Sequence, residues 1–111
     1  MTDSFKLVHF ILVLLLFMGT SVSYADAQSE LAELRGEIDR LDKQILELIN
    51  KRAEVVFKIG ELKRENNMAV YDPTREKIIE QRLIKMNTGP MPNTAVVKIF
   101  KTIIEASRTL Q

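Results

Sequence analysis

An apolar stripe between Leu31 and Leu62 constrains the fold more than any other feature of the sequence. Its members alternate in spacings of three and four residues, as in a helix that packs against another helix. The stripe consists of Leu31, Leu34, Ile38, Leu41, Ile45, Leu48, Val55, Ile59 and Leu62. The predicted helix has about 35 residues and is about 50 Å long. A chain of this size cannot cover it well, so we expect a helix from a second copy to do so.

Two shorter helices are predicted after the polar run Glu65–Asn67. Asp72 is a good N-cap for the second helix, and Pro73 suits its first position. The loop Asn87–Asn93 contains one glycine and two prolines and must end that helix, after which Asn93 or Thr94 is expected to cap the third. Since no strand pattern occurs, the predicted class is all-α, with one long helix and two shorter ones.

Residues 1–27 have the features of a secretory signal peptide. Lys6 precedes the apolar run 7–18, and small residues follow at Ala25 and Ala27. We expect cleavage after Ala27 or after Ala25, one domain over residues 28–111, and export to the periplasm or the medium. The apolar run is shorter than the roughly 20 residues that span a bilayer, so an uncleaved anchor is the weaker alternative and no stable membrane association is expected.

The sequence has no cysteine and one histidine, His9, which lies in the leader. The predicted domain therefore lacks Ser-His and Cys-His nucleophile systems and the usual zinc ligands. The net charge is +1 with mixed signs, which gives no nucleic-acid footprint. An enzyme of this composition must use Arg, Lys, carboxylates and neutral polar groups, so neither a metal nor a cofactor is expected.

Arg52 occupies a position where the apolar stripe requires a buried apolar side chain. Lys63 follows eleven residues later, which places it about 20° away around the helix and about 16 Å along its axis. Two long cationic side chains at this spacing can bracket a small carboxylate. There are two alternatives for Arg52. It can set the register of a coiled coil, or its side chain can reach along apolar surface to water.

Other polar residues interrupt the apolar faces of the shorter helices. Ser107 and Gln111 extend the apolar face of the third helix, and Glu76 lies beside Arg75 in the first turn of the second. Each alone is typical of a solvated face or a helix-end charge. Together with Arg52 they predict a polar, anion-binding pocket inside a helical bundle.

The stretches "LRGEIDRLDKQILELINKR", "KIGELK", "VYDPTREK" and "IFKTIIEASRTLQ" resemble the all-helical chorismate mutase family in residue type, order and spacing. The resemblance covers residues 31–111. It implies an intertwined homodimer with antiparallel first helices and two identical active sites. The implied reaction is the Claisen rearrangement of chorismate to prephenate, on the route to phenylalanine and tyrosine.

The resemblance also implies roles for individual residues. Arg35 matches an arginine donated across the dimer, and Arg52 matches an arginine of the same chain. Both hold carboxylates of the substrate. Lys63 matches the lysine that bonds the ether oxygen of the substrate, with Gln111 at the position of its glutamine partner.

Four further positions of the pattern lie in the second and third helices. Glu76 and the Asp72 region match the groups that meet the ring hydroxyl, and Arg75 and Ser107 match further pocket positions. The rearrangement is pericyclic and needs no nucleophile, proton shuttle or metal. It needs orientation and electrostatic stabilisation, which Arg, Lys and Gln can supply.

Two alternatives stand beside this interpretation. An isochorismate-pyruvate lyase of the same fold would share the arginines and the lysine, but such lyases tend not to keep the carboxylates of the "D-P-x-R-E" segment. A non-catalytic exported helical dimer or binding protein would explain the apolar stripe. It would not explain why polar residues from three helices converge.

Overall fold

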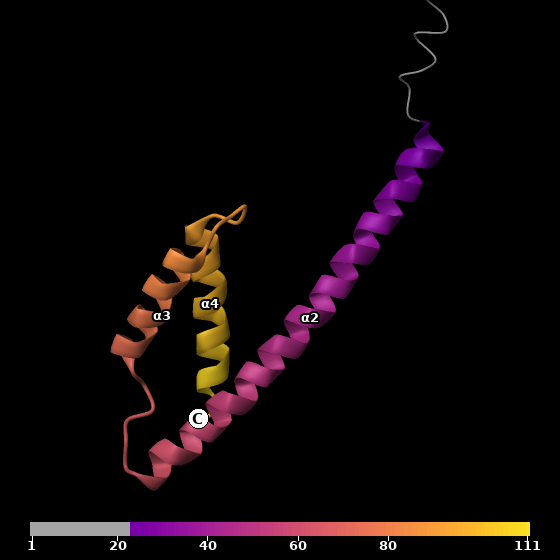
Figure 1. The fold of residues 1–111 in the computed structure, drawn as a ribbon. Helices are drawn as coiled ribbons and strands as arrows, with labels where there is room; N and C mark the ends of the chain where they lie inside the picture. The colour runs from indigo at the N-terminus through magenta and orange to yellow at the C-terminus, as the bar shows by residue number, and fades with distance from the viewer. Residues whose placement is uncertain (1–22) are drawn as a thin grey trace, which may run out of the picture. The chain divides into compact units, whose positions relative to one another are not determined.

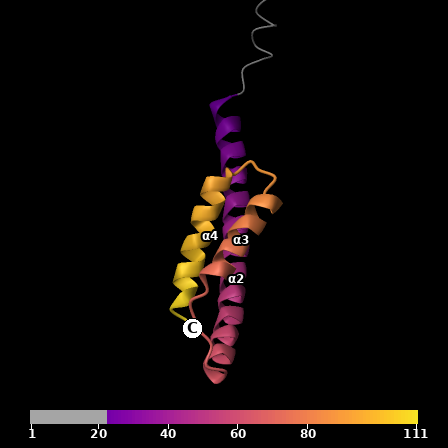
Figure 2. The same cartoon turned by 90° about the vertical axis from the view of Figure 1, so that its left-hand side faces the viewer.

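The computed structural model describes residues 23–111, and every regular element in this range is an α-helix. Helix α2 spans Tyr24–Glu65, α3 spans Pro73–Met86, and α4 spans Asn93–Arg108 (Figures 1 and 2). The predicted all-α class with one long helix and two shorter ones is confirmed. Among residues 23–111 no helix is both long and apolar enough to cross a membrane.

Helix α2 begins earlier than the stripe alone predicts. Its first turn starts at Tyr24, within the segment that the sequence assigns to the leader, where Ser23 Oγ accepts a hydrogen bond from the Asp26 amide at 3.2 Å. The remainder of the predicted signal peptide, residues 1–22, lies outside the described residues. The cleavage site after Ala27 or Ala25 therefore stays a prediction.

The end of α2 is set by Asn67, which has a positive φ of 55°. The Met68 amide donates to the Lys63 carbonyl at 2.8 Å, and the Asn67 amide donates to the Arg64 carbonyl at 3.4 Å. This pair of bonds is the Schellman arrangement, in which Asn is one of the few residues that tolerate the left-handed conformation. The predicted end at Glu65–Asn67 is confirmed, and the chain turns at Asn66 and Asn67.

Helix α3 begins as its sequence predicts. Asp72 is the N-cap, with its Oδ1 accepting a hydrogen bond from the Arg75 amide at 2.9 Å, and Pro73 occupies the first helical position. Since the first amides of a helix have no partner within it, this bond satisfies one of them.

The start of α4 differs from the expectation that Asn93 or Thr94 caps it. Pro92 occupies the N-cap position, and no side chain makes a capping bond. The reason is that the Asn93 side-chain oxygen already accepts a hydrogen bond from Asn87 Nδ2 at 2.7 Å. Asn87 also donates to the Met91 carbonyl at 2.8 Å, so these side chains fix the loop rather than the helix end.

The described residues divide into two compact units, residues up to Asp42 and residues 43–111. In the second unit α3 and α4 lie side by side (Figures 1 and 2). Its buried set is small and consists of Val56, Gly60, Ile79 and Ser107. Each member of the apolar stripe, by contrast, is between 41% and 63% exposed. The single chain therefore leaves the stripe of α2 largely uncovered. Burial of such apolar surface would be favourable.

The Asp72 cap gives a stability prediction. Asp72→Ala should lower the free energy of unfolding by about 1 kcal/mol, because it leaves the Arg75 amide without its acceptor. Asp72→Asn should keep most of that stability, since asparagine caps about as well as aspartate. Urea unfolding followed by circular dichroism at one protein concentration measures both. Equal losses in the two variants would show that the carboxylate charge, not the cap, is what stabilises the fold here.

Candidate active site

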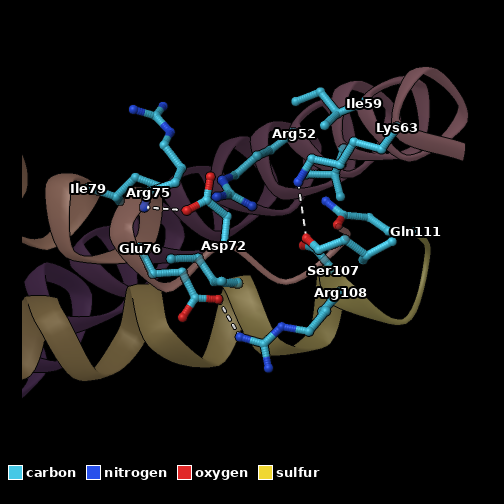
Figure 3. A pocket seen from close by; sticks show the side chains of 13 residues that line it. Arg52, Ile59, Lys63, Asp72, Arg75, Glu76, Ile79, Ser107, Arg108 and Gln111 are labelled. Carbon is cyan, nitrogen blue, oxygen red and sulfur yellow. Dashed lines mark hydrogen bonds and ion pairs between the residues drawn. The ribbon is translucent and has the colours of Figure 1, made fainter. Parts of the chain in front are cut away.

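One pocket in the second unit is lined by side chains from α2, α3 and α4 (Figure 3). It brings together all the predicted site residues except Arg35, namely Arg52, Lys63, Asp72, Arg75, Glu76, Ser107 and Gln111. Its apolar lining includes Val56, Ile59, Ile79 and Ile104. Arg35 lies on the part of α2 that belongs to the first unit and is not among the lining residues.

Arg52 has the least satisfied polar side chain in this pocket. Its Nη1 atom is buried and has no hydrogen-bond partner within the described chain. A guanidinium carries five N–H donors in a rigid fork, and leaving a buried donor unpaired costs about 1–3 kcal/mol. Because carboxylates match this fork with two parallel bonds, the geometry of Arg52 suits a carboxylate ligand.

Lys63 is held at the pocket by the segment that follows α2. Its Nζ donates to the Val70 main-chain oxygen at 3.0 Å in a partly buried bond. An ammonium has three donors, so this bond fixes the position of the group and leaves donors for a ligand. Figure 3 shows Lys63 and Gln111 at the same end of the pocket.

Ser107 is 7% exposed and lies at the pocket wall. Its Oγ donates to the Ile103 carbonyl at 2.7 Å, one turn back in α4. With its proton engaged there, the hydroxyl presents its lone pairs to the pocket as an acceptor. Ser107 therefore suits a hydroxyl or amide donor of a ligand better than a carboxylate.

Glu76 makes an ion pair with Arg108, a pocket residue that the sequence interpretation missed (Figure 3). The hydrogen bond that Arg108 donates to the Glu76 carboxylate raises the pKa of the Arg108 guanidinium above its usual value. The guanidinium also lies over the ring of Tyr71, 4.6 Å from its centroid, where a cation is attracted to the aromatic face. In the sequence, the one feature that could have placed Arg108 in the pocket is its position directly after Ser107. That position does not indicate an ion pair with a residue of α3.

The charges that line the pocket are unbalanced. Arg52, Lys63, Arg75 and Arg108 are positive, whereas the only carboxylates are those of Asp72 and Glu76. The carboxylate of Glu76 is already paired, and that of Asp72 accepts from a main-chain amide. A pocket with excess positive charge and low-dielectric walls attracts anions. Figure 3 shows the Arg75 side chain turned toward the outer edge of this group.

Fold and pocket together define an all-helical protein with a positively charged pocket, lined by arginines, a lysine and amide or hydroxyl groups. Residues 34–111 match the profile of chorismate mutase type II. The chain belongs to this family, and the resemblance found in the sequence is confirmed.

Relatives of known sequence support this membership. The chain is 41% identical over 86 residues to a bifunctional chorismate mutase/prephenate dehydratase of Aquifex aeolicus, a match that covers 74% of this chain but 24% of that protein. It is 35% identical over 83 residues to a chorismate mutase of Methanocaldococcus jannaschii, covering 74% and 84% of the two chains. The chain thus spans about a quarter of the length of the bifunctional relative.

Solved structures give the same result. A chorismate mutase of Thermus thermophilus matches with a TM-score of 0.69 and 38% identity, covering 70% of this chain and 89% of that one. A chorismate mutase of Helicobacter pylori in complex with prephenate matches with a TM-score of 0.68 and 32% identity, covering 74% and 89%.

The buried Nη1 of Arg52, which has no partner among residues 23–111, gives a second prediction. Arg52→Met should leave the free energy of unfolding of the ligand-free protein unchanged or raise it by about 1 kcal/mol, because it removes a buried donor that lacks a partner. Lys51→Met, at an exposed position beside it on the same helix, is the matched control and should have little effect. Urea unfolding measures both. A clear loss of stability for Arg52→Met alone would mean that the guanidinium makes stabilising contacts in the free protein.

Proposed function

We propose that this protein is a chorismate mutase that converts chorismate to prephenate, on the route to phenylalanine and tyrosine. The observation that carries the proposal is the buried Nη1 donor of Arg52, which has no partner among residues 23–111 and shares one pocket with Lys63 in a chain of this family. Chorismate carries two carboxylates and an ether oxygen, and these are the groups that such cations recognise.

The proposed chemistry is a Claisen rearrangement, in which one carbon–oxygen bond breaks while one carbon–carbon bond forms. The protein holds the flexible dianion in a chair-like geometry. The entropy cost of reaching this geometry is therefore met on binding and does not add to the barrier of the reaction. Arg52 binds one carboxylate of the substrate. Lys63 and Gln111 donate hydrogen bonds to the ether oxygen as negative charge grows on it.

The carboxylate side of the pocket orients the rest of the substrate. Glu76 and the Asp72 region meet the ring hydroxyl, and Ser107 and Arg75 complete the pocket wall. No covalent intermediate forms on any of these residues. The ion pair of Glu76 with Arg108 keeps this carboxylate in one orientation, so that it can accept from the hydroxyl without reorganisation.

The proposed functional form is a homodimer with shared active sites. The exposed stripe of α2 supplies the apolar surface that a second copy would bury, with the two α2 helices antiparallel. Within one α2 helix, Arg35 and Arg52 are about 25 Å apart and point about 100° away from each other, which one substrate cannot span. The second carboxylate is therefore bound by Arg35 from the other subunit.

Export is part of the proposal and rests on the leader-like sequence of residues 1–27. The protein is proposed to act in the periplasm or outside the cell. Expression of the full sequence with cell fractionation tests this. The expected product is a chain that begins at Gln28, or at Asp26 if cleavage follows Ala25, in the exported fraction. A full-length chain in the membrane fraction would indicate an uncleaved anchor.

An assay of the purified protein tests the activity directly. Chorismate consumption is followed by absorbance, and prephenate is identified by its acid-catalysed conversion to phenylpyruvate. Absence of turnover with a folded protein would refute the proposal. Release of pyruvate from isochorismate, without mutase activity, would instead establish the lyase alternative.

Lys63 gives a prediction about the transition state. Lys63→Ala should lower kcat about a hundred- to a thousandfold while KM changes little, because the lost hydrogen bond forms mainly as charge develops on the ether oxygen. Lys58→Ala removes an exposed lysine from the same helix and is the control. Steady-state kinetics separate the two parameters. A Lys63 variant with normal kcat and only a raised KM would contradict this role.

The shared site predicts complementation between two inactive variants. Arg35→Ala and Arg52→Ala should each be nearly inactive as homodimers. When they are mixed, unfolded and refolded together, half of the dimers are hybrids with one intact site, so activity should recover to about a quarter of the wild-type level. One variant is labelled with nitrogen-15, because the two variants otherwise have the same mass, and hybrids are then quantified by native mass spectrometry. If hybrids form while activity stays at the level of the single variants, the shared-site model fails.

A further inference from the structure

Gly60 lies where α2 meets the last residue of the sequence. It is buried, and a Cβ atom added to it would lie 2.8 Å from the Gln111 Cα, 3.1 Å from its Cβ and 3.3 Å from its Cγ. Carbon atoms that are not bonded prefer separations of about 3.5–4.0 Å. Since the nearest atom belongs to the main chain, it cannot rotate away as the tip of a side chain can. Only glycine permits this approach.

Gly36, the other glycine within α2, has no such steric need to be glycine. A Cβ atom added to Gly36 would meet only the tip of the Arg40 side chain, at 3.7 Å, which is ordinary contact. A glycine inside a helix is less favourable than alanine in both places. At Gly60 the structure provides a steric reason for it.

Arg64, one turn beyond Gly60 on α2, holds the same residue from another direction. Its Nη1 donates to the main-chain oxygen of Gln111 at 2.6 Å. On the other side, the Gln111 amide donates to the Arg108 carbonyl at 3.2 Å, which continues the last turn of α4. Gln111 is thus fixed between the end of α4 and the face of α2, and its side chain lines the pocket together with that of Lys63 (Figure 3).

We propose that Gly60 and Arg64 are positioning residues that hold Gln111 so that its side-chain amide reaches the ether oxygen of the substrate beside Lys63. This inference rests on the proposed mutase function. Gly60 acts by leaving room for the Gln111 backbone, and Arg64 acts by anchoring its main-chain oxygen.

The test compares Gly60→Ala, Gln111→Ala and the double variant. Gly60→Ala should lower kcat about a hundredfold with a small change in KM, since displacing a donor by about 1 Å costs a factor of this size. The double variant should be no slower than Gln111→Ala, because Gly60 acts only through Gln111. Gly36→Ala makes the same change elsewhere in α2 and should keep kcat. Arg64→Ala should lower kcat several-fold, and Arg64→Lys should restore part of the loss.

A second measurement does not depend on activity. The backbone heteronuclear Overhauser effect of Gln111, measured by nuclear magnetic resonance, should be high in the wild type and in Gly36→Ala. It should fall in Gly60→Ala, since the last residue is released from α2. Circular dichroism confirms that each variant is folded.

The measurements test the role of Gly60 and the proposed mutase function separately. An unchanged kcat and an unchanged Overhauser effect in Gly60→Ala would overturn the inference, as would losses that multiply in the double variant. If the wild type fails to convert chorismate, the proposed function falls. The Overhauser effect of Gln111 then still shows whether Gly60 holds this residue in place.

Discussion

The length of α2 is the constraint on which the rest of the structure depends. This helix has 42 residues, whereas α3 has 14 and α4 has 16. Two short helices cannot bury an apolar stripe of that length, so only a few side chains of the second unit are buried. A helix of about 40 residues, moreover, places its two halves too far apart to serve one small ligand. The same length that leaves the stripe exposed is therefore the reason why a site shared between two copies is proposed.

The pocket shows how binding competes with stability. Arg52 lies where an apolar side chain would strengthen the core, and its buried Nη1 has no partner in the described chain. Lys63 and Gln111, by contrast, are fixed by bonds to Val70 and Arg64 that exist without a ligand. The unsatisfied donor is thus confined to the group proposed to bind a carboxylate. Proteins often break local rules of folding at functional positions, and Arg52 is the position in this pocket that is proposed to be one.

Sequence reasoning reached the fold and most of the pocket because both follow from rigid helix geometry. Three predicted features depend on residues close in sequence, and the structure agrees with each. They are the spacing of Arg52 and Lys63 on α2, the Asp72 cap of α3 and the end of α2 at Asn67. The cap of α4 was missed because of a local bond between Asn87 and Asn93, whereas the misses in the pocket depend on contacts between distant segments. The Glu76–Arg108 ion pair joins residues 32 apart, and the Gly60 approach joins α2 to the end of the chain. No periodic pattern encodes such contacts, so only the three-dimensional structure reveals them.

Lys63 and Gln111, the proposed donors to the ether oxygen, are both positioned by α2. Lys63 projects from α2 itself, and Gln111 is held to α2 through Gly60 and Arg64, within five residues of sequence. Two donors that act on one atom stabilise charge well only when their separation is fixed before the reaction begins. Motion of α4 as a whole would shift Gln111 relative to Lys63 if α4 were its only support. Because Gln111 is also anchored to α2, such motion is restrained where it matters, and the short segment from Gly60 to Arg64 sets the spacing of both donors.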